Sequence, residues 1–230
     1  MKNIRERRNF LKFILYSSLF FYSNQFVLAS KKLTNTKILS SLIFKKHIIS
    51  ENHPEKPERI EFIIKAIKTS GLINIFENFN LNRKVENWIR LIHSEEHINL
   101  LKLAFPLAER VSQHAVKICL EGVDRIMNGV NKNIFCATRP PGHHALNTGK
   151  DEGFCFYNHI AITAKYIQKK YKLSKILIVD WDYHHGNSTE FFFYDDPSVL
   201  FFSTHDQFAY PGTGSPQRKG AGKGLGFNIN

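Results

Sequence analysis

The strongest constraint in this sequence is a short apolar run that leads directly into acidic residues and histidines. The run covers Ile176 to Val179, and Asp180, Asp182, His184 and Asn187 follow it within eight residues. Such a run is typical of a buried strand, and the carboxyl end of a parallel strand opens into the ligand crevice of α/β folds. Alternate side chains of an extended chain share one face, so we expect Asp180, Asp182 and His184 to point the same way.

These three side chains favour a metal site. Two carboxylates and an imidazole on one face repel and desolvate one another unless a cation lies between them. Mixed nitrogen and oxygen ligation without thiolates suits Zn2+, and Fe2+ or Mn2+ is also accepted. The alternative is a polar strand end with solvated acids and a hydrogen-bonded histidine.

The rest of the chain alternates apolar strand patterns with helical ones. This alternation predicts an α/β domain with a central, mostly parallel sheet flanked by helices. The helical patterns cover Ile60 to Ile67, His114 to Met127 and Asn158 to Lys170, and further buried strands are predicted at Ile134 to Thr138 and Val199 to Phe202. The glycine-rich stretch from Gly212 to Gly226 is predicted to be a loop.

Charge and cysteine content exclude some classes of protein. The net charge is +12, but residues 1–29 hold five of the Lys and Arg residues against one Glu, and the remainder contains no dense basic run. This distribution favours a solvated surface over a nucleic-acid groove. Three cysteines, Cys119, Cys136 and Cys155, are too few for a disulfide framework, and we expect Cys119 and Cys136 to be small core residues.

Residues 1–29 have the parts of an export signal. Arg7 and Arg8 precede an apolar stretch from Phe13 to Leu28, and Ala29 supplies a small residue for cleavage. The paired arginines resemble the twin-arginine motif, whose machinery carries folded proteins. We therefore expect a signal peptide at 1–29, a domain at 30–230, and a periplasmic or extracellular location. The alternatives are a basic tail or an uncleaved anchor, with a cytoplasmic location if the leader does not function.

Two adjacent histidines follow a Pro-Pro-Gly turn. His143 and His144 can divide general-base and general-acid work, because the charge of histidine changes near neutral pH. Asp180 is the natural partner for His143, and Asn187 can bond the other imidazole without adding charge. Partners of different charge separate the two pKa values. A His-His pair by itself is also common on protein surfaces.

Together these motifs resemble the histone deacetylase family, which includes bacterial acetylpolyamine amidohydrolases and acetoin-utilisation proteins. The motif from Asp180 to Asn187, which ends in Gly and Asn, is more similar to the class II branch and its bacterial relatives than to class I. The blocks occur in the family's order from about residue 47 onward, at 53–59, 139–145, 153–158, 179–187, 199–205 and 210–214.

The resemblance implies an arginase/deacetylase-like fold and a role for each matching residue. Asp182 and His184 match zinc ligands, and His143 and His144 match the acid–base pair, supported by Asp180 and Asn187. Phe154 and Tyr210, with Gly153, match the walls of the slot that holds the acyl-amine stem; core packing is the alternative. Asp180, Asp182, His184 and Ser203 match a structural K+ site, and Arg59 matches an arginine near the pocket floor.

The implied activity is zinc-dependent hydrolysis of an acetylated amine, such as acetyl-lysine in a peptide or an acetylpolyamine. The family's third metal ligand and its catalytic tyrosine match nothing up to Asn230, and we expect a fragment of a longer reading frame. Besides substrate, the expected partner is the export machinery, and no nucleic acid is expected. The alternatives are an inactive protein that binds acylated amines and an arginase-like hydrolase, which the Asp-x-Asp-x-His order disfavours.

Overall fold

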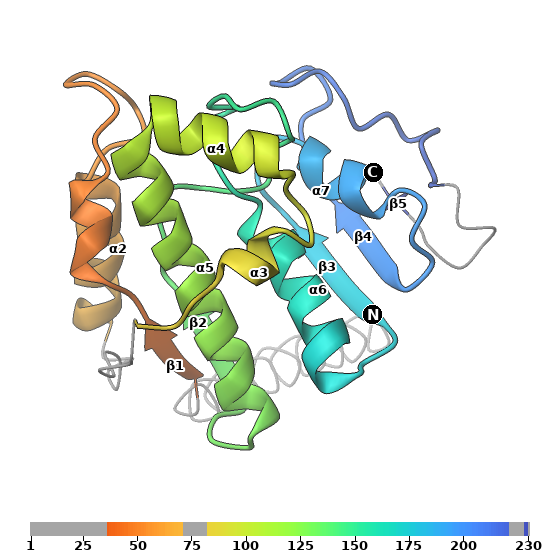
Figure 1. Cartoon of the computed structure of the whole chain (residues 1–230), viewed down its shortest axis with the longest axis horizontal. Helices are drawn as coiled ribbons and strands as arrows, with labels where there is room; N and C mark the ends of the chain where they lie inside the picture. The colour runs from red at the N-terminus through yellow and green to blue at the C-terminus, as the bar shows by residue number, and fades with distance from the viewer. Residues whose placement is uncertain (1–35, 71–81, 221–227, 230) are drawn as a thin grey trace, which may run out of the picture.

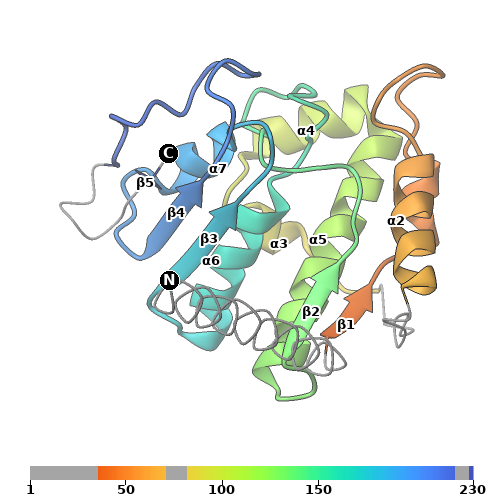
Figure 2. The same cartoon turned by 180° about the vertical axis from the view of Figure 1, so that it is seen from behind.

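The computed structural model describes residues 36–70, 82–220 and 228–229. Parallel strands lie side by side in it, with helices packed on one face (Figure 1, Figure 2). This arrangement confirms the predicted α/β class with a parallel sheet. The export signal predicted at 1–29 and the last part of the predicted glycine-rich loop lie outside the described residues.

The strands form two hydrogen-bonded groups. β1 (Thr36–Leu39) pairs in parallel with β2 (Asn133–Cys136). β3 (Ile176–Asp180) pairs in parallel with β4 (Val199–Ser203), which pairs in parallel with β5 (Asn228–Ile229). The register places Asp180 opposite Ser203, so the carboxyl ends of β3 and β4 meet at one edge.

The three predicted helices are present as α2, α5 and α6. α6 (His159–Tyr171) begins where Asn158 caps it, the Asn158 side chain accepting a hydrogen bond from the Ala161 N–H. α5 (Pro106–Met127) begins eight residues before the prediction, with a proline at its first position, where no N–H is needed. The other helices are η2 (Leu42–Lys46), α2 (Glu58–Thr69), α3 (Glu86–Ile89), α4 (Glu95–Ala104) and α7 (Asn187–Phe193).

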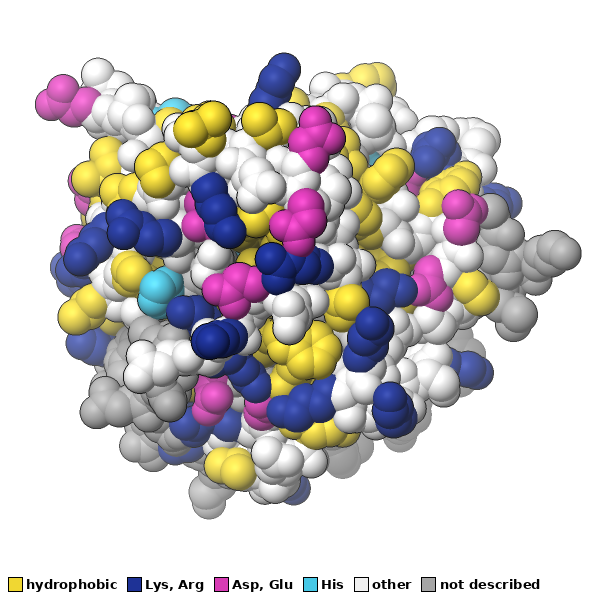
Figure 3. Space-filling view, viewed as in Figure 1, with side chains coloured by type: hydrophobic (Ala, Val, Ile, Leu, Met, Phe, Trp, Pro, Cys, Tyr) yellow, Lys and Arg dark blue, Asp and Glu magenta, His cyan; other side chains and the backbone are white. Residues whose placement is uncertain are grey.

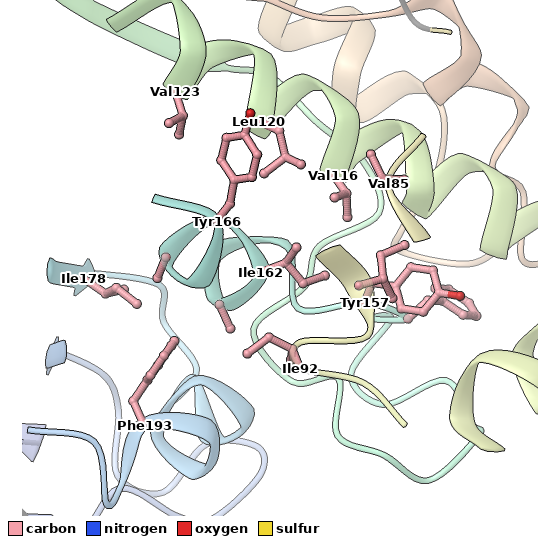
Figure 4. Close-up of a cluster of buried hydrophobic side chains, with 14 of the residues drawn as sticks. Val85, Ile92, Val116, Leu120, Val123, Tyr157, Ile162, Tyr166, Ile178 and Phe193 are labelled. Carbon is pink, nitrogen blue, oxygen red and sulfur yellow. The ribbon is translucent and has the colours of Figure 1, made fainter. Parts of the chain in front are cut away.

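Helix α5 lies between two hydrophobic clusters. One side of it, including Val116, Leu120 and Val123, packs against Ile162 and Tyr166 of α6 (Figure 4). Another side packs against β1 and η2 in a second cluster that contains Ile38, Leu39, Phe44, Val111 and Ile118. Gly122 allows β2 to approach, because a Cβ there would lie 3.0 Å from Ile134. Ile126, in the last turn of α5, is 40% exposed.

Within the described part of the chain, β2 and β3 are covered on one face only. Ile178 is 5% exposed, whereas Leu177 and Val179 are 61% and 45% exposed, and Phe135 of β2 is 46% exposed. Alternate side chains of a strand face opposite ways, and α5 and α6 cover only one of these faces (Figure 2). The apolar runs predicted the strands correctly but not their burial. None of the helices in the described residues is both long and apolar enough to cross a bilayer.

Candidate functional site

A cavity of about 520 Å³ opens at the carboxyl end of β3. Eight of the predicted site residues line it, and they come from five separate segments of the chain. Its lining is Arg59, Pro141, His143, His144, Gly153, Phe154, Asp182, Tyr183, His184 and Tyr210. Asp180 and Asn187 lie behind this lining and contact the histidines. The fold therefore gathers the predicted residues at the edge where α/β proteins bind ligands.

Each histidine of the pair is held by its Nδ1 atom. His143 Nδ1–H donates to Asp180 Oδ2 at 2.9 Å, and His144 Nδ1–H donates to Asn187 Oδ1 at 2.7 Å. Both predicted contacts are present, and the two rings lie 4.0 Å apart. Because Nδ1 is engaged, Nε2 of each ring is the atom that remains for the cavity.

The surroundings of the pair lower the pKa of His144 and that of Asp180. Burial lowers the pKa of His144 to about 4, and the adjacent His143 adds to the effect. Burial raises the pKa of Asp180, but its hydrogen bond with His143 outweighs this, and the pKa lies below its usual value. At neutral pH His144 is thus a neutral acceptor, and an ionised Asp180 faces His143.

Asp180, Asp182 and His184 come together by a route other than the predicted one. The extended strand ends at Asp180, so alternation along a strand does not place the other two. Instead, the Asp182 N–H donates to Asp180 Oδ1 at 3.1 Å, and the His184 N–H donates to Asp182 Oδ1 at 2.8 Å. These two tight turns bring Asp182 Oδ1 within 3.2 Å of His184 Nδ1 and 3.9 Å of His143 Nε2.

Asp182 and His184 fit a zinc ion in part. Their carboxylate and imidazole are the donor types that zinc takes, and both side chains are about half exposed in the cavity lining. A catalytic zinc usually has three protein ligands. Across residues 36–70, 82–220 and 228–229, no group of three or more His, Cys, Asp or Glu side chains is placed to hold a metal.

The predicted potassium donors have protein partners. Ser203 is buried, and its hydroxyl lies 2.8 Å from His205 Nδ1. The Asp180 carbonyl accepts the Thr204 N–H at 3.0 Å. The register of β3 and β4 keeps Asp180 beside Ser203, and the Asp180 carbonyl oxygen retains a second lone pair.

Two aromatic residues flank the cavity, and the backbone of one is strained. Phe154 has a φ of +70°, which is rare for a bulky side chain and costs about 1–3 kcal/mol. It packs edge-on against His53 at 4.5 Å, and Tyr210 packs edge-on against His144 at 4.9 Å. Gly153 must remain a glycine, because a Cβ there would lie 2.3 Å from the His144 ring. Strain of this kind concentrates at functional sites.

Arg59 lines the cavity from its open side. Its side chain is exposed in the described part of the chain, and it lines the cavity together with Pro141. Its position near the pocket floor stays a prediction.

Glu55 and Arg139 form an ion pair that no sequence pattern predicted. Both are buried, and Arg139 holds the Glu55 carboxylate through Nε at 2.9 Å and Nη2 at 2.7 Å. Arg139 also donates to the carbonyls of Phe44 and His47. This pair fastens the segment before α2 to the start of the loop that carries His143 and His144. The only sequence signal for this pairing is that the two residues have opposite charges and lie in two separate motifs.

A second histidine pair was also missed. His93 and His97 stack at 4.7 Å and are 2% and 0% exposed. His93 bonds the Asn147 side chain and the Asn158 N–H, and His97 bonds the Phe156 carbonyl and the Gly149 N–H. All four ring nitrogens are therefore used to hold the loop that presents Gly153 and Phe154.

Comparison with known proteins agrees with this geometry. Residues 53–230 match the family described as "Histone deacetylase domain". The chain is 35% identical to Histone deacetylase 9 of Homo sapiens over 223 residues and 33% identical to Histone deacetylase 6 of Caenorhabditis elegans over 210 residues. These alignments cover 79% and 78% of this chain, and 22% of each relative.

A solved structure shares the fold. The structure titled "Crystal Structure of HDA15 HD domain" aligns with a TM-score of 0.74 and 28% sequence identity, over 84% of this chain and 62% of that one. The chain thus spans about a fifth of the length of the curated relatives and less than two thirds of the solved domain. The family match covers more than half of this sequence, and the chain belongs to the histone deacetylase family.

Proposed function

We propose that this chain is the N-terminal and central part of a zinc-dependent deacetylase that hydrolyses an acetylated amine. One observation carries the proposal: two imidazoles, anchored through Nδ1 by a carboxylate and by an amide, line the cavity beside Asp182 and His184. An acid–base pair with different partners next to two metal-donor side chains is suited to metal-assisted amide hydrolysis.

The metal would be held by Asp182 and His184, together with a further ligand outside the described residues. When bound, zinc would polarise the acyl carbonyl and lower the pKa of a water molecule. Fe2+ and Mn2+ would be held by the same donor types. A structural K+ remains part of the proposal through the family resemblance alone.

The two histidines would divide the proton transfers. The neutral His144 offers Nε2 as an acceptor for a proton from water. His143 is held by Asp180 through Nδ1, which leaves its Nε2 facing the cavity, and His143 would donate a proton to the departing amine. Asn187 keeps His144 oriented without adding charge.

The aromatic side chains would hold the substrate. Phe154 and Tyr210 come from separate loops and line the same cavity, where two flat apolar walls suit the methylene stem of an acylated amine. An acetylated polyamine or an acetyl-lysine peptide fits this description. With the twin-arginine-like leader at 1–29, we propose an exported enzyme whose substrates are small acylamines.

The test measures zinc content and turnover of an acetyl-lysine reporter and an acetylated polyamine. It compares the 230-residue chain with the longest reading frame that contains it. The proposal requires that the longer form binds one zinc and turns over, and that Asp182→Asn abolishes both. Asp195→Asn is the matched control, because Asp195 is exposed and does not line the cavity. A longer form that contains zinc but hydrolyses no acylamine would contradict the proposal.

A second candidate is an acylamine-binding protein without catalysis. It is favoured by the absence, among the described residues, of a third side chain that completes the metal site. Calorimetric binding of the acetyl-lysine reporter to both forms, with turnover by neither, would establish it.

A further inference from the structure

Basic side chains gather at the end of the molecule opposite the cavity. Segments 82–86, 121–133 and 165–175 contain nine Lys and Arg residues and three Asp and Glu residues. Figure 3 shows Lys and Arg side chains clustered over the lower part of this face, where Figure 1 places the last turns of α5 and α6. We call this surface the basic end. These three segments therefore carry a formal net charge of +6.

A polar network joins the segments of the basic end. Asp124 of α5 accepts hydrogen bonds from Tyr166 and Tyr171 at 2.6 Å and from Lys170 at 2.9 Å, and it pairs with Arg83. A second acid on α5 is also engaged, since Glu121 pairs with Arg125. Asp124 and Glu121 are thus both bonded to side chains of this same surface. The exposed lysines around them are Lys84, Lys132, Lys169, Lys172 and Lys175.

Apolar side chains are exposed among these lysines. Val130 is 63% exposed, Leu173 43%, Ile126 40% and Met127 36%. They lie in the last turn of α5, the turn that follows it, and the turn after α6, next in sequence to the lysines. Lysines mixed with exposed aliphatic side chains suit the headgroup region of an anionic bilayer, where lysine meets phosphate and apolar groups enter the acyl boundary.

The direction of the strands places the basic end and the cavity at opposite ends of the sheet. β2 begins at Asn133, directly after Lys132, and β3 begins one residue after Lys175. Their carboxyl ends carry the cavity. Thr36, where the chain enters β1 from the leader, pairs with Asn133 and so lies at the basic end. A surface bound here would face both the basic end and the point where the leader joins.

We propose that the basic end binds the surface of an anionic phospholipid bilayer and turns the cavity toward the solution. The lysines contact lipid phosphates, and Val130 and Leu173 insert between the headgroups. This inference concerns a surface at the other end of the strands from the cavity and does not rest on the proposed catalytic activity.

The test is co-sedimentation of the full chain with vesicles of phosphatidylcholine, alone or with about one third phosphatidylglycerol. The test variant replaces Lys84, Lys132, Lys169 and Lys175 with Gln. The matched control replaces four other exposed lysines, Lys56, Lys102, Lys150 and Lys219, with Gln and so has the same net charge. Lys170 is kept because it bonds Asp124, and Lys172 because its φ is +58°.

We expect the test variant to bind phosphatidylglycerol vesicles at least tenfold more weakly, since each lysine near an anionic surface contributes substantially. The control should stay within twofold of the unmodified chain, and binding should weaken at high salt. A Val130→Ser, Leu173→Ser variant should bind more weakly with an unchanged salt dependence. Lysines in the last turn of α6 also stabilise that helix, so equal thermal unfolding of the variants is checked first.

Three results would overturn the proposal. Equal loss in both lysine variants would show a response to net charge and not to this surface. Equal binding to phosphatidylcholine alone would assign the binding to apolar contacts such as the leader. Tighter binding of a 20-base-pair DNA duplex than of phosphatidylglycerol vesicles, lost in the test variant alone, would make the basic end a nucleic-acid surface.

Discussion

Two histidine pairs in this protein have opposite uses, and the difference lies in the atoms that remain unpaired. His93 and His97 bond protein groups through all four ring nitrogens and are almost completely buried. His143 and His144 are fixed through Nδ1 alone and line a cavity. A satisfied imidazole is a structural crosslink, whereas one fixed at a single nitrogen is oriented and still able to exchange a proton.

The largest expected effect is on activity. If the proposed function holds, His143→Ala and His144→Ala each lower the turnover of the acetyl-lysine reporter by about 10²- to 10⁴-fold, because each removes one proton-transfer group. Thermal unfolding should change little. His114→Ala is the control, since His114 bonds only the Arg110 carbonyl of its own helix. Full activity in either variant would remove that histidine from the mechanism.

Replacing a histidine of the buried pair should lower stability much more than activity. His97→Leu keeps the approximate volume but leaves the Gly149 N–H and the Phe156 carbonyl without their partner, which costs about 2–4 kcal/mol of unfolding free energy. Denaturant unfolding measures this loss, and His114→Leu is the matched control. The activity per folded molecule should fall much less than in His144→Ala. A stability loss below that of the control would show that the crosslink contributes nothing.

One contribution to the pH dependence of stability should come from the buried His93. Burial lowers the pKa of His93 to about 3, whereas it is about 6.5 in the unfolded chain. Below pH 6.5 the unfolded chain therefore takes up a proton that the folded chain refuses, so stability is full above pH 6.5 and is lost as the pH falls toward 3. Between pH 6.5 and pH 5 the loss is about 2 kcal/mol.

Replacing His93 with glutamine removes this titration. The unfolding free energy of His93→Gln, although lower at pH 7, should decline less between pH 6.5 and pH 5 than that of the unmodified chain. Denaturant unfolding at both pH values gives the two slopes. Parallel slopes would mean that His93 has the same pKa in the folded and unfolded states.

The smallest expected effect is that of Asn187, which orients the His144 ring but transfers no proton. Asn187→Ala removes one hydrogen bond to His144 Nδ1, worth about 0.5–1.5 kcal/mol, so turnover should fall by about 3- to 10-fold. Asn187→Asp keeps an oxygen acceptor at the same position and should restore the orientation of the ring. A loss as large as that of His144→Ala would mean that Asn187 does more than orient the imidazole.

Local patterns were enough to predict three of the helices, three of the strands and most of the residues that line the cavity. Apolar runs marked β3 and β4, and an asparagine cap marked the start of α6. The partners of His143 and His144 followed from their chemistry and are present. The burial of β2 and β3 was wrong because a run of apolar residues does not tell which strand faces are covered. The turns after Asp180 were missed because side-chain bonds to backbone N–H groups replace the extended chain there.

The sequence by itself determined the parallel α/β class, the family and the identity of the cavity residues, since each depends on short-range spacing or on motif order. Only the tertiary structure decided the pairing of Glu55 with Arg139, which are 84 residues apart, and the fully bonded state of His93 and His97. It also decided that the lysines gather at one end. These features depend on which segments meet in space, and contacts between distant segments arise from packing that no local pattern encodes.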